Sequence, residues 1–200
     1  MSFSPVRSLE IRPAFAAFVL ALAYVDLCGI FWPFFAAAVL HELAHIAAIR
    51  AAGGQIIRVR LGFGDAQIDF TPLPARLESL CALAGPGLNA LCAAALLHRL
   101  PVFACVSAIL AAFNLLPLWP LDGGRVLLLL LSLHFAEPQA RRICRITGLA
   151  CCALLGALAV YAAWRLQAGL WVLLPAILPA FRLLRWHAAE KAVAFQPRCG

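Results

Sequence analysis

One apolar stretch of the sequence carries two histidines and a glutamate at a spacing suited to a metal site. The stretch AAAVLHELAHIAAIRAAGG spans residues 36–54, with His41 and His45 four residues apart. On a helix that spacing puts both imidazoles on one face. Two such imidazoles can bind one zinc ion, and the intervening Glu42 can reach the water that this metal activates. The stretch therefore predicts a zinc-dependent hydrolytic site.

The composition places this site in a membrane. The chain has 200 residues, of which 64% are hydrophobic and 12% charged, and its mean hydropathy is +0.94. Soluble domains keep roughly a quarter of their residues charged. We expect an all-α polytopic membrane protein with about six transmembrane helices, each needing about 20 apolar residues. These spans are expected near residues 13–29, 31–52, 76–97, 102–133, 141–164 and 169–184.

The predicted helices form one domain over residues 1–200, with a motif-bearing core at about 31–135. Ionisable residues within a span are costly and are functional by default. A histidine that binds zinc is neutral, so metal binding removes much of that cost. The alternative is that His41, Glu42 and His45 only bond to neighbouring helices. We favour the metal site because three such groups on one turn would otherwise need three separate partners.

The positive charges predict the orientation of the chain. With the N-terminus in the cytoplasm, the outer loops receive only Arg99 and Arg165, and Arg125 is left uncounted. Positive charge collects on the cytoplasmic side of membrane proteins, so both termini are expected to be cytoplasmic. The net charge of +7 then reflects orientation and contact with anionic lipid, and no nucleic-acid partner is expected. The thirteen residues assigned to the inner face are Arg7, Arg12, Arg50, Arg58, Arg60, Arg76, Arg141, Arg142, Arg145, Arg182, Arg185, Lys191 and Arg198.

The segment between the second and third expected spans alternates apolar and polar residues. In IIRVRLGFGDAQIDFTP, residues 56–72, this period of two runs on both sides of GFGD. Such a pattern predicts a β-hairpin, and its position between two inner helix ends places it at the cytoplasmic membrane surface. A plain amphipathic connector is the alternative.

The fourth expected span contains a segment that a helix cannot cross smoothly. It reads FNLLPLWPLDGGRVL, residues 113–127. Pro117 and Pro120 each remove a backbone donor, and Gly123 and Gly124 are expected to loosen the chain after Asp122. Irregular backbone at membrane depth is tolerated where it faces protein or a watery cavity. The break also accounts for the excess length of this span.

Asp122, within this segment, is the candidate third zinc ligand. A catalytic zinc site has three protein ligands and an open position. Asp122 and the pair His41 and His45 are both expected in the inner half of the bilayer. His134 is the rival ligand, although it lies nearer the inner end of its span.

Three motifs in this order resemble the site-2 protease family of intramembrane zinc metalloproteases. They are HELAH at residues 41–45, AGPGLN at 84–89 and NLLPLWPLDGG at 114–124. The chain looks most like the compact bacterial, sporulation-type members without PDZ or CBS domains. The resemblance implies that His41, His45 and Asp122 bind one Zn²⁺ per chain and that Glu42 is the general base.

The resemblance also implies roles outside the zinc ligands. It suggests that Asn89 holds the substrate or the oxyanion, with Asn114 as a second candidate, and that the hairpin offers an edge strand to the substrate. Either asparagine could instead bond across helices as structural glue. A homo-oligomer or a regulatory membrane partner stays open.

The expected function is hydrolysis of a peptide bond in a single-span membrane protein, within the cytoplasmic half of the bilayer. The expected location is a bacterial inner membrane. A catalytically inactive zinc-binding scaffold or a metal carrier is the alternative, and the presence of Glu42 argues for an enzyme. A prenyl-protein type of membrane protease would use a glutamate as third ligand, and the Asp122 motif argues against it.

Overall fold

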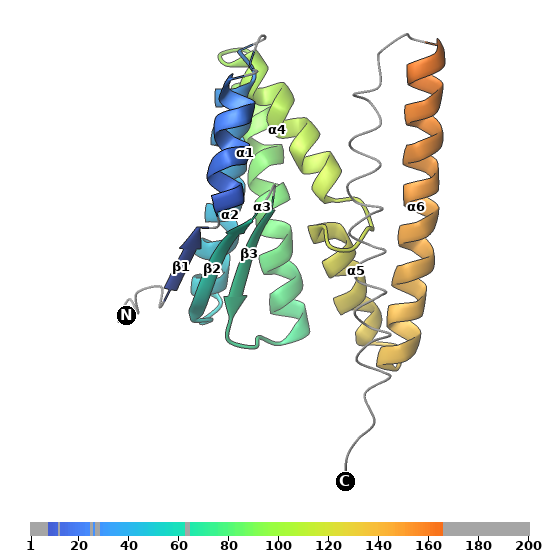
Figure 1. Ribbon diagram of the computed structural model, residues 1–200. Helices are drawn as coiled ribbons and strands as arrows, with labels where there is room; N and C mark the ends of the chain where they lie inside the picture. The colour runs from blue at the N-terminus through green and yellow to red at the C-terminus, as the bar shows by residue number, and fades with distance from the viewer. Residues whose placement is uncertain (1–7, 12, 25, 27–28, 63–64, 166–200) are drawn as a thin grey trace. The chain divides into compact units, whose positions relative to one another are not determined.

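The computed structural model describes most of the chain and divides it into two compact units. The division lies between Asn114 and Leu115, and each unit is described by itself (Figure 1). The residues described are 8–11, 13–24, 26, 29–62 and 65–165.

The first unit is built on a set of apolar helices. They are α1 (Pro13–Tyr24), α2 (Phe31–Ala51), α3 (Ala75–Leu96) and α4 (Pro101–Asn114). Helix α3 contacts both α2 and α4. By length and composition α2 and α3 could each cross a membrane, whereas α4 is a shorter apolar helix. Helix α1 covers 12 residues of the first expected span.

The hairpin predicted from the sequence is confirmed. Strands β2 (Ile56–Gly62) and β3 (Asp65–Phe70) pair antiparallel, with Val59 opposite Ile68. A further strand, β1 (Ser8–Ile11), pairs in parallel with β2 and was not expected from the sequence. The sheet order is β1-β2-β3, so β2 is central.

The sheet packs against the end of α2 and the beginning of α3. The buried residues of this core are Ile49 from α2, Ile56 and Val59 from β2, and Cys81 from α3. Gly53, with a φ of +84°, comes just after α2 and allows the chain to turn toward β2. Hydrophobic burial therefore fixes the hairpin against the same two helices that carry the HELAH and AGPGLN motifs.

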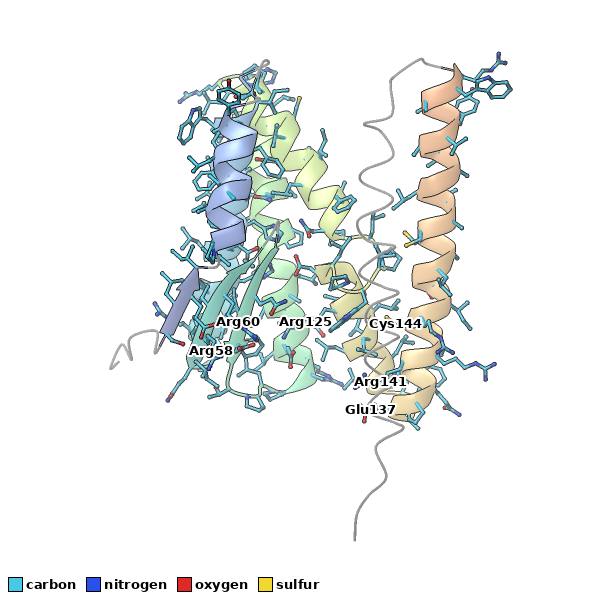
Figure 2. The ribbon with its side chains drawn as sticks, viewed as in Figure 1. Arg58, Arg60, Arg125, Glu137, Arg141 and Cys144 are labelled. Atoms are coloured by element: carbon cyan, nitrogen blue, oxygen red, sulfur yellow. The ribbon has the colours of Figure 1, made fainter. Side chains whose placement is uncertain are left out.

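Ion pairs tie the three strands together. Arg58 Nη1 lies 3.4 Å from Glu10 Oε1 across β1 and β2. Arg60 Nη2 donates to both carboxylate oxygens of Asp69, at 3.1 and 2.9 Å, across β2 and β3. Figure 2 labels both arginines on the sheet. These side chains are partly exposed, so each ion pair contributes little to the stability of the fold.

The second unit contains α5 (Asp122–Ser132) and α6 (Glu137–Arg165). The region 102–133 is thus divided into α4, residues 115–121 and α5, which confirms the predicted break. Helix α6 is long and apolar enough to cross a membrane, so the described residues contain three such helices. Six spans are not confirmed, and the expected span at 169–184 lies outside the described residues.

The two glycines after Asp122 do not loosen the chain, contrary to the sequence-based expectation. Both lie in the first turn of α5, and residues 115–121 fold directly over them. A Cβ on Gly123 would meet backbone atoms of Leu115, and one on Gly124 would lie 2.6 Å from the carbonyl oxygen of Leu118. Glycine is needed here because backbone approaches backbone.

Helix α6 contacts α5 at Gly124. Cys144 Sγ donates to the carbonyl oxygen of Gly124 at 3.6 Å. Near the start of α6, Arg141 Nη2 lies 2.6 Å from Glu137 Oε1, four residues earlier. Figure 2 labels these three side chains on α6.

Candidate metal centre

His41 and His45 lie together on the buried face of α2. The face consists of Ala37, His41, His45 and Ile49, each four residues after the last, as the helical repeat requires. The Nε2 atoms of the two histidines are 3.2 Å apart. Their ring centroids are 4.8 Å apart, with the ring planes at 83°. The two imidazoles thus lie together on one helix face, and their role as zinc ligands stays a prediction.

Residues of α3 contact the Nδ1 atom of each imidazole. His45 Nδ1 lies 2.8 Å from the carbonyl oxygen of Cys81. His41 Nδ1 lies 3.2 Å from Nδ2 of Asn89, whose side chain is fully buried. Each imidazole is therefore oriented by an outer partner, meaning the group on α3 that contacts its Nδ1 atom. The Nε2 atom of each ring faces the other ring. Outer partners of this kind fix the ring orientation of metal-binding histidines.

Gly85 gives the two imidazoles their space. A Cβ at this position would lie 2.7 Å from Cε1 of His45 and 2.8 Å from Cε1 of His41, and closer still to Nε2 of His45. Such distances are too short for any side chain, so only glycine allows α3 to pack against both rings. The sequence alone does not indicate this role, because it depends on how α3 packs against α2.

The donor geometry fits a zinc ion. Two nitrogen ligands at about 2.0–2.1 Å in a tetrahedral site are separated by about 3.3 Å. The separation of the Nε2 atoms of His41 and His45, 3.2 Å, agrees with this value. Both residues are buried, and each has its Nδ1 atom partnered. The pair is therefore prepared to present Nε2 atoms to one metal.

Of the other predicted site residues, Glu42 shares α2 with the two histidines, whereas Asp122 lies on α5. Glu42 is half-buried on α2, directly after His41. Asp122 is the half-buried first residue of α5 and belongs to the second unit. Its role as third ligand stays a prediction. The rival His134 is exposed, and its Nδ1 lies 3.3 Å from the carbonyl oxygen of Leu130 in the preceding turn.

The two predicted asparagines differ in their surroundings. Asn89 reaches across from α3 to His41, so it does bond between helices, and the sequence did not predict its histidine partner. Asn114 is the last residue of α4, and its Nδ2 donates to the carbonyl oxygen of Leu110 at 3.0 Å. A role for Asn114 with substrate or oxyanion stays a prediction.

Comparisons with known proteins agree with one family. Residues 74–155 match the model of peptidase family M50, a segment that contains Asn89 and Asp122 and begins after the two histidines. Over 76 residues the chain is 38% identical to stage IV sporulation protein FB of Bacillus subtilis (strain 168). That match covers 38% of this chain and 26% of the relative.

The fold has a counterpart among solved structures. The site-2 protease from Methanocaldococcus jannaschii superposes with a TM-score of 0.63. The alignment covers 92% of this chain and 93% of the other, at 20% sequence identity. At this identity the match speaks for the fold.

Proposed function

We propose that this chain is a member of the site-2 protease family, peptidase family M50, and acts as an intramembrane zinc metalloprotease. Its reaction is hydrolysis of a peptide bond in a single-span membrane protein, in the cytoplasmic half of the bilayer. The observation that supports this best is the pair of buried imidazoles whose Nε2 atoms lie 3.2 Å apart. The Nδ1 atom of each ring also has a partner on α3, which fixes the ring orientation.

In this proposal Asp122 is the third zinc ligand. A carboxylate completes the donor set of a hydrolytic zinc site with two histidines. Asp122 begins α5, and the first turn of a helix favours negative charge. The backbone of residues 115–121 packs on Gly123 and Gly124. This packing gives the start of α5 a defined conformation.

Glu42 is the general base. A zinc ion bound by His41, His45 and Asp122 would polarise the scissile carbonyl and make water a stronger nucleophile. Glu42 accepts the proton of the attacking water at its carboxylate and returns it to the leaving amine. Its position beside His41 on α2 leaves it close to the ligands without being one of them.

The sheet supports the proposed substrate class. A transmembrane helix hides its carbonyl groups in its own hydrogen bonds, so it must unwind before hydrolysis. An extended segment can recover hydrogen bonds by pairing with the edge of a sheet. Strand β3 lies at one edge of the sheet, and the sheet packs on α2 and α3 next to the histidines. The proposed location is the inner membrane of a bacterium, with both termini in the cytoplasm.

The decisive experiment separates the base from the ligands. Glu42→Gln keeps the size of the side chain and removes the base, so zinc should stay bound. Cleavage of a single-span substrate in liposomes should fall by about 10²–10⁴-fold, the usual contribution of a general base. Glu137→Gln, on the exposed start of α6, is the matched control and should cleave normally.

The outcomes distinguish the alternatives. Full cleavage by Glu42→Gln would exclude this mechanism. Zinc bound by the wild-type chain without any cleavage would favour the inactive scaffold or the metal carrier. Asp122→Ala should lose zinc and activity together. Unchanged zinc content in that variant would transfer the third-ligand role to His134.

A further inference from the structure

Three arginines lie close together near the beginning of α6. Arg141, Arg142 and Arg145 follow Pro138 at intervals of three or four residues, so all four residues share one face of the helix. Their side chains line an open hollow of about 230 Å³. The proposed hydrolysis gives this hollow no role.

The positive charge of the hollow is only partly neutralised. Arg141 Nε and Nη2 donate to Oε1 of Glu137, at 3.0 and 2.6 Å. Among the residues that the structure describes, Arg142 and Arg145 have no carboxylate within ion-pair distance. A guanidinium stays charged in proteins and carries five N–H donors. Since Arg142 and Arg145 are three positions apart on the helix, both can donate to one anion.

The arginine face is not the face through which α6 packs. Arg142 is exposed and Arg145 is partly exposed. A ligand can therefore reach both guanidinium groups without disturbing the packing of α6 on α5. The buried residues at this end of α6 lie on another side of the helix and are Ala140, Cys144 and Gly148.

The length of α6 indicates the depth of the hollow in a membrane. Residues 146–164, which follow Arg145, contain no Asp, Glu, Lys or Arg. A helix of this length extends about 28 Å, close to the roughly 30 Å of the hydrocarbon core. Tyr161 and Trp164 are exposed at its far end, where aromatic residues typically meet the membrane interface. Arg145 therefore lies at one boundary of the core, and Arg142 lies about 5 Å further out, at headgroup depth.

Beyond the hollow, the same face of α6 is apolar and open. Leu149 and Val160 continue the helical repeat of Arg142 and Arg145, and both are exposed. A Cβ at Gly156, between them, would meet nothing within 4 Å. A hydrocarbon chain can lie along this face. A ligand that carries both a phosphate and an acyl chain thus matches the two parts of the face.

We propose that the hollow binds the headgroup phosphate of one anionic phospholipid, with Arg142 and Arg145 as its principal contacts. Guanidinium groups bind phosphate oxygens through paired hydrogen bonds. The acyl chains of the lipid lie along the apolar face of α6. This is a saturable site at one place on one helix, which distinguishes it from the general attraction of basic residues to an anionic membrane. In the proposed orientation the lipid belongs to the cytoplasmic leaflet, and its binding requires neither zinc nor proteolysis.

The test titrates the delipidated, full-length chain in neutral detergent with phosphatidylglycerol and counts bound lipids by native mass spectrometry. We expect one lipid to bind more tightly than any further lipid. Arg142→Gln and Arg145→Gln should each weaken binding of this lipid about fivefold, which corresponds to about 1 kcal/mol per basic residue. The matched control is Arg76→Gln, because Arg76 is an exposed arginine at the start of α3. It removes the same charge and should bind the lipid as the wild type does.

The outcomes separate a lipid site from its alternatives. Equal weakening in Arg76→Gln would mean that net charge alone attracts the lipid, and would overturn the proposal. Wild-type binding in both Arg142→Gln and Arg145→Gln would also overturn it. If Arg145→Gln unfolds early in lipid-free detergent, the exposed Arg142 alone decides the test.

Competition identifies the source of the phosphate. Phosphatidylcholine with the same acyl chains should displace the bound lipid poorly, because its choline offsets the phosphate charge. Inorganic phosphate should also displace it poorly, because it has no acyl chain. Ready displacement by inorganic phosphate would assign the hollow to a free anion, and ready displacement by phosphatidylcholine would assign it to phospholipids of any charge. Either result would refute the inference and leave the proposed protease activity untouched.

Discussion

The carbonyl oxygen of Cys81 lies 2.8 Å from Nδ1 of His45, while the side chain of Cys81 packs in the core beneath the sheet. One residue of α3 thus connects the hydrophobic core to the candidate metal centre. Its backbone sets the direction of His45, and its side chain contributes to the packing of β2 on α2 and α3. The hairpin and the histidines therefore depend on the same placement of α3 against α2.

Gly85→Ala should destabilise the protein and disturb the histidines. The added methyl group would overlap both imidazoles, and such overpacking costs about 1–3 kcal/mol of unfolding free energy. Zinc affinity should fall in the same variant, because the rings must move. Thermal unfolding in detergent and zinc titration measure the two effects.

Gly87→Ala provides the control on the same helix. Nothing lies within 4 Å of a Cβ at Gly87, so the alanine should raise stability by roughly 0.5–1 kcal/mol through its better helix propensity. Zinc affinity should not change. If Gly85→Ala and Gly87→Ala lost the same stability, overlap with the imidazoles would not be the cause of the loss in Gly85→Ala.

Gly124→Ala should destabilise the second unit. Its methyl group would overlap backbone atoms of Leu118 and Trp119, which cannot rotate away as a side chain can. We expect a loss at or above the roughly 1–3 kcal/mol of ordinary overpacking. Gly156→Ala on α6 has nothing within 4 Å and should be neutral or stabilising. Unfolding temperatures of the two variants that do not differ would contradict the close approach of residues 115–121 to α5.

Asp26→Ala should weaken the start of α2 and leave the metal centre intact. Asp26 accepts hydrogen bonds from the backbone N–H groups of Ile30 and Phe31, at 3.0 and 3.1 Å. Loss of a side-chain cap costs about 0.5–2 kcal/mol. The unfolding temperature should fall, while zinc content, measured on the same sample, should equal that of the wild type. Zinc loss in a folded Asp26→Ala protein would disprove this purely structural role.

The charge asymmetry predicts how the helices cross the membrane. Reporter fusions after Arg76, at the start of α3, and after Arg145, in the first third of α6, should read cytoplasmic. A fusion at Arg99, between α3 and α4, should read external. A cytoplasmic signal at Arg99 would rule out the orientation proposed for the helices.

Local sequence patterns predicted much of this structure. The spacing of His41 and His45 predicted a shared helix face, because a helix repeats regardless of its surroundings. The alternation in residues 56–72 predicted the hairpin, and Pro117 with Pro120 predicted the break before α5. Each of these signals lies within a few neighbouring residues.

Contacts between distant segments were not accessible in the same way. The four-residue strand β1 pairs with β2 about 50 positions later, and its sequence is too short to show a clear period. The roles of Cys81 and Gly85 depend on the packing of α3 against α2. The sequence-based expectation that Gly123 and Gly124 loosen the chain was wrong for the same reason. These glycines allow a close approach of backbone to backbone, and this can be recognised only when the facing backbone is known.

The contacts of His41 and His45 with Asn89, Gly85 and Cys81 also prevent α2 and α3 from sliding past each other. His41 contacts Asn89 and the later His45 contacts the earlier Cys81, with Gly85 between these two partners. The helices are thus antiparallel at this point. A slip of one turn, about 5.4 Å, would move the gap at Gly85 away from the rings and break both hydrogen bonds at once. The two helices therefore have one register that accommodates the imidazoles.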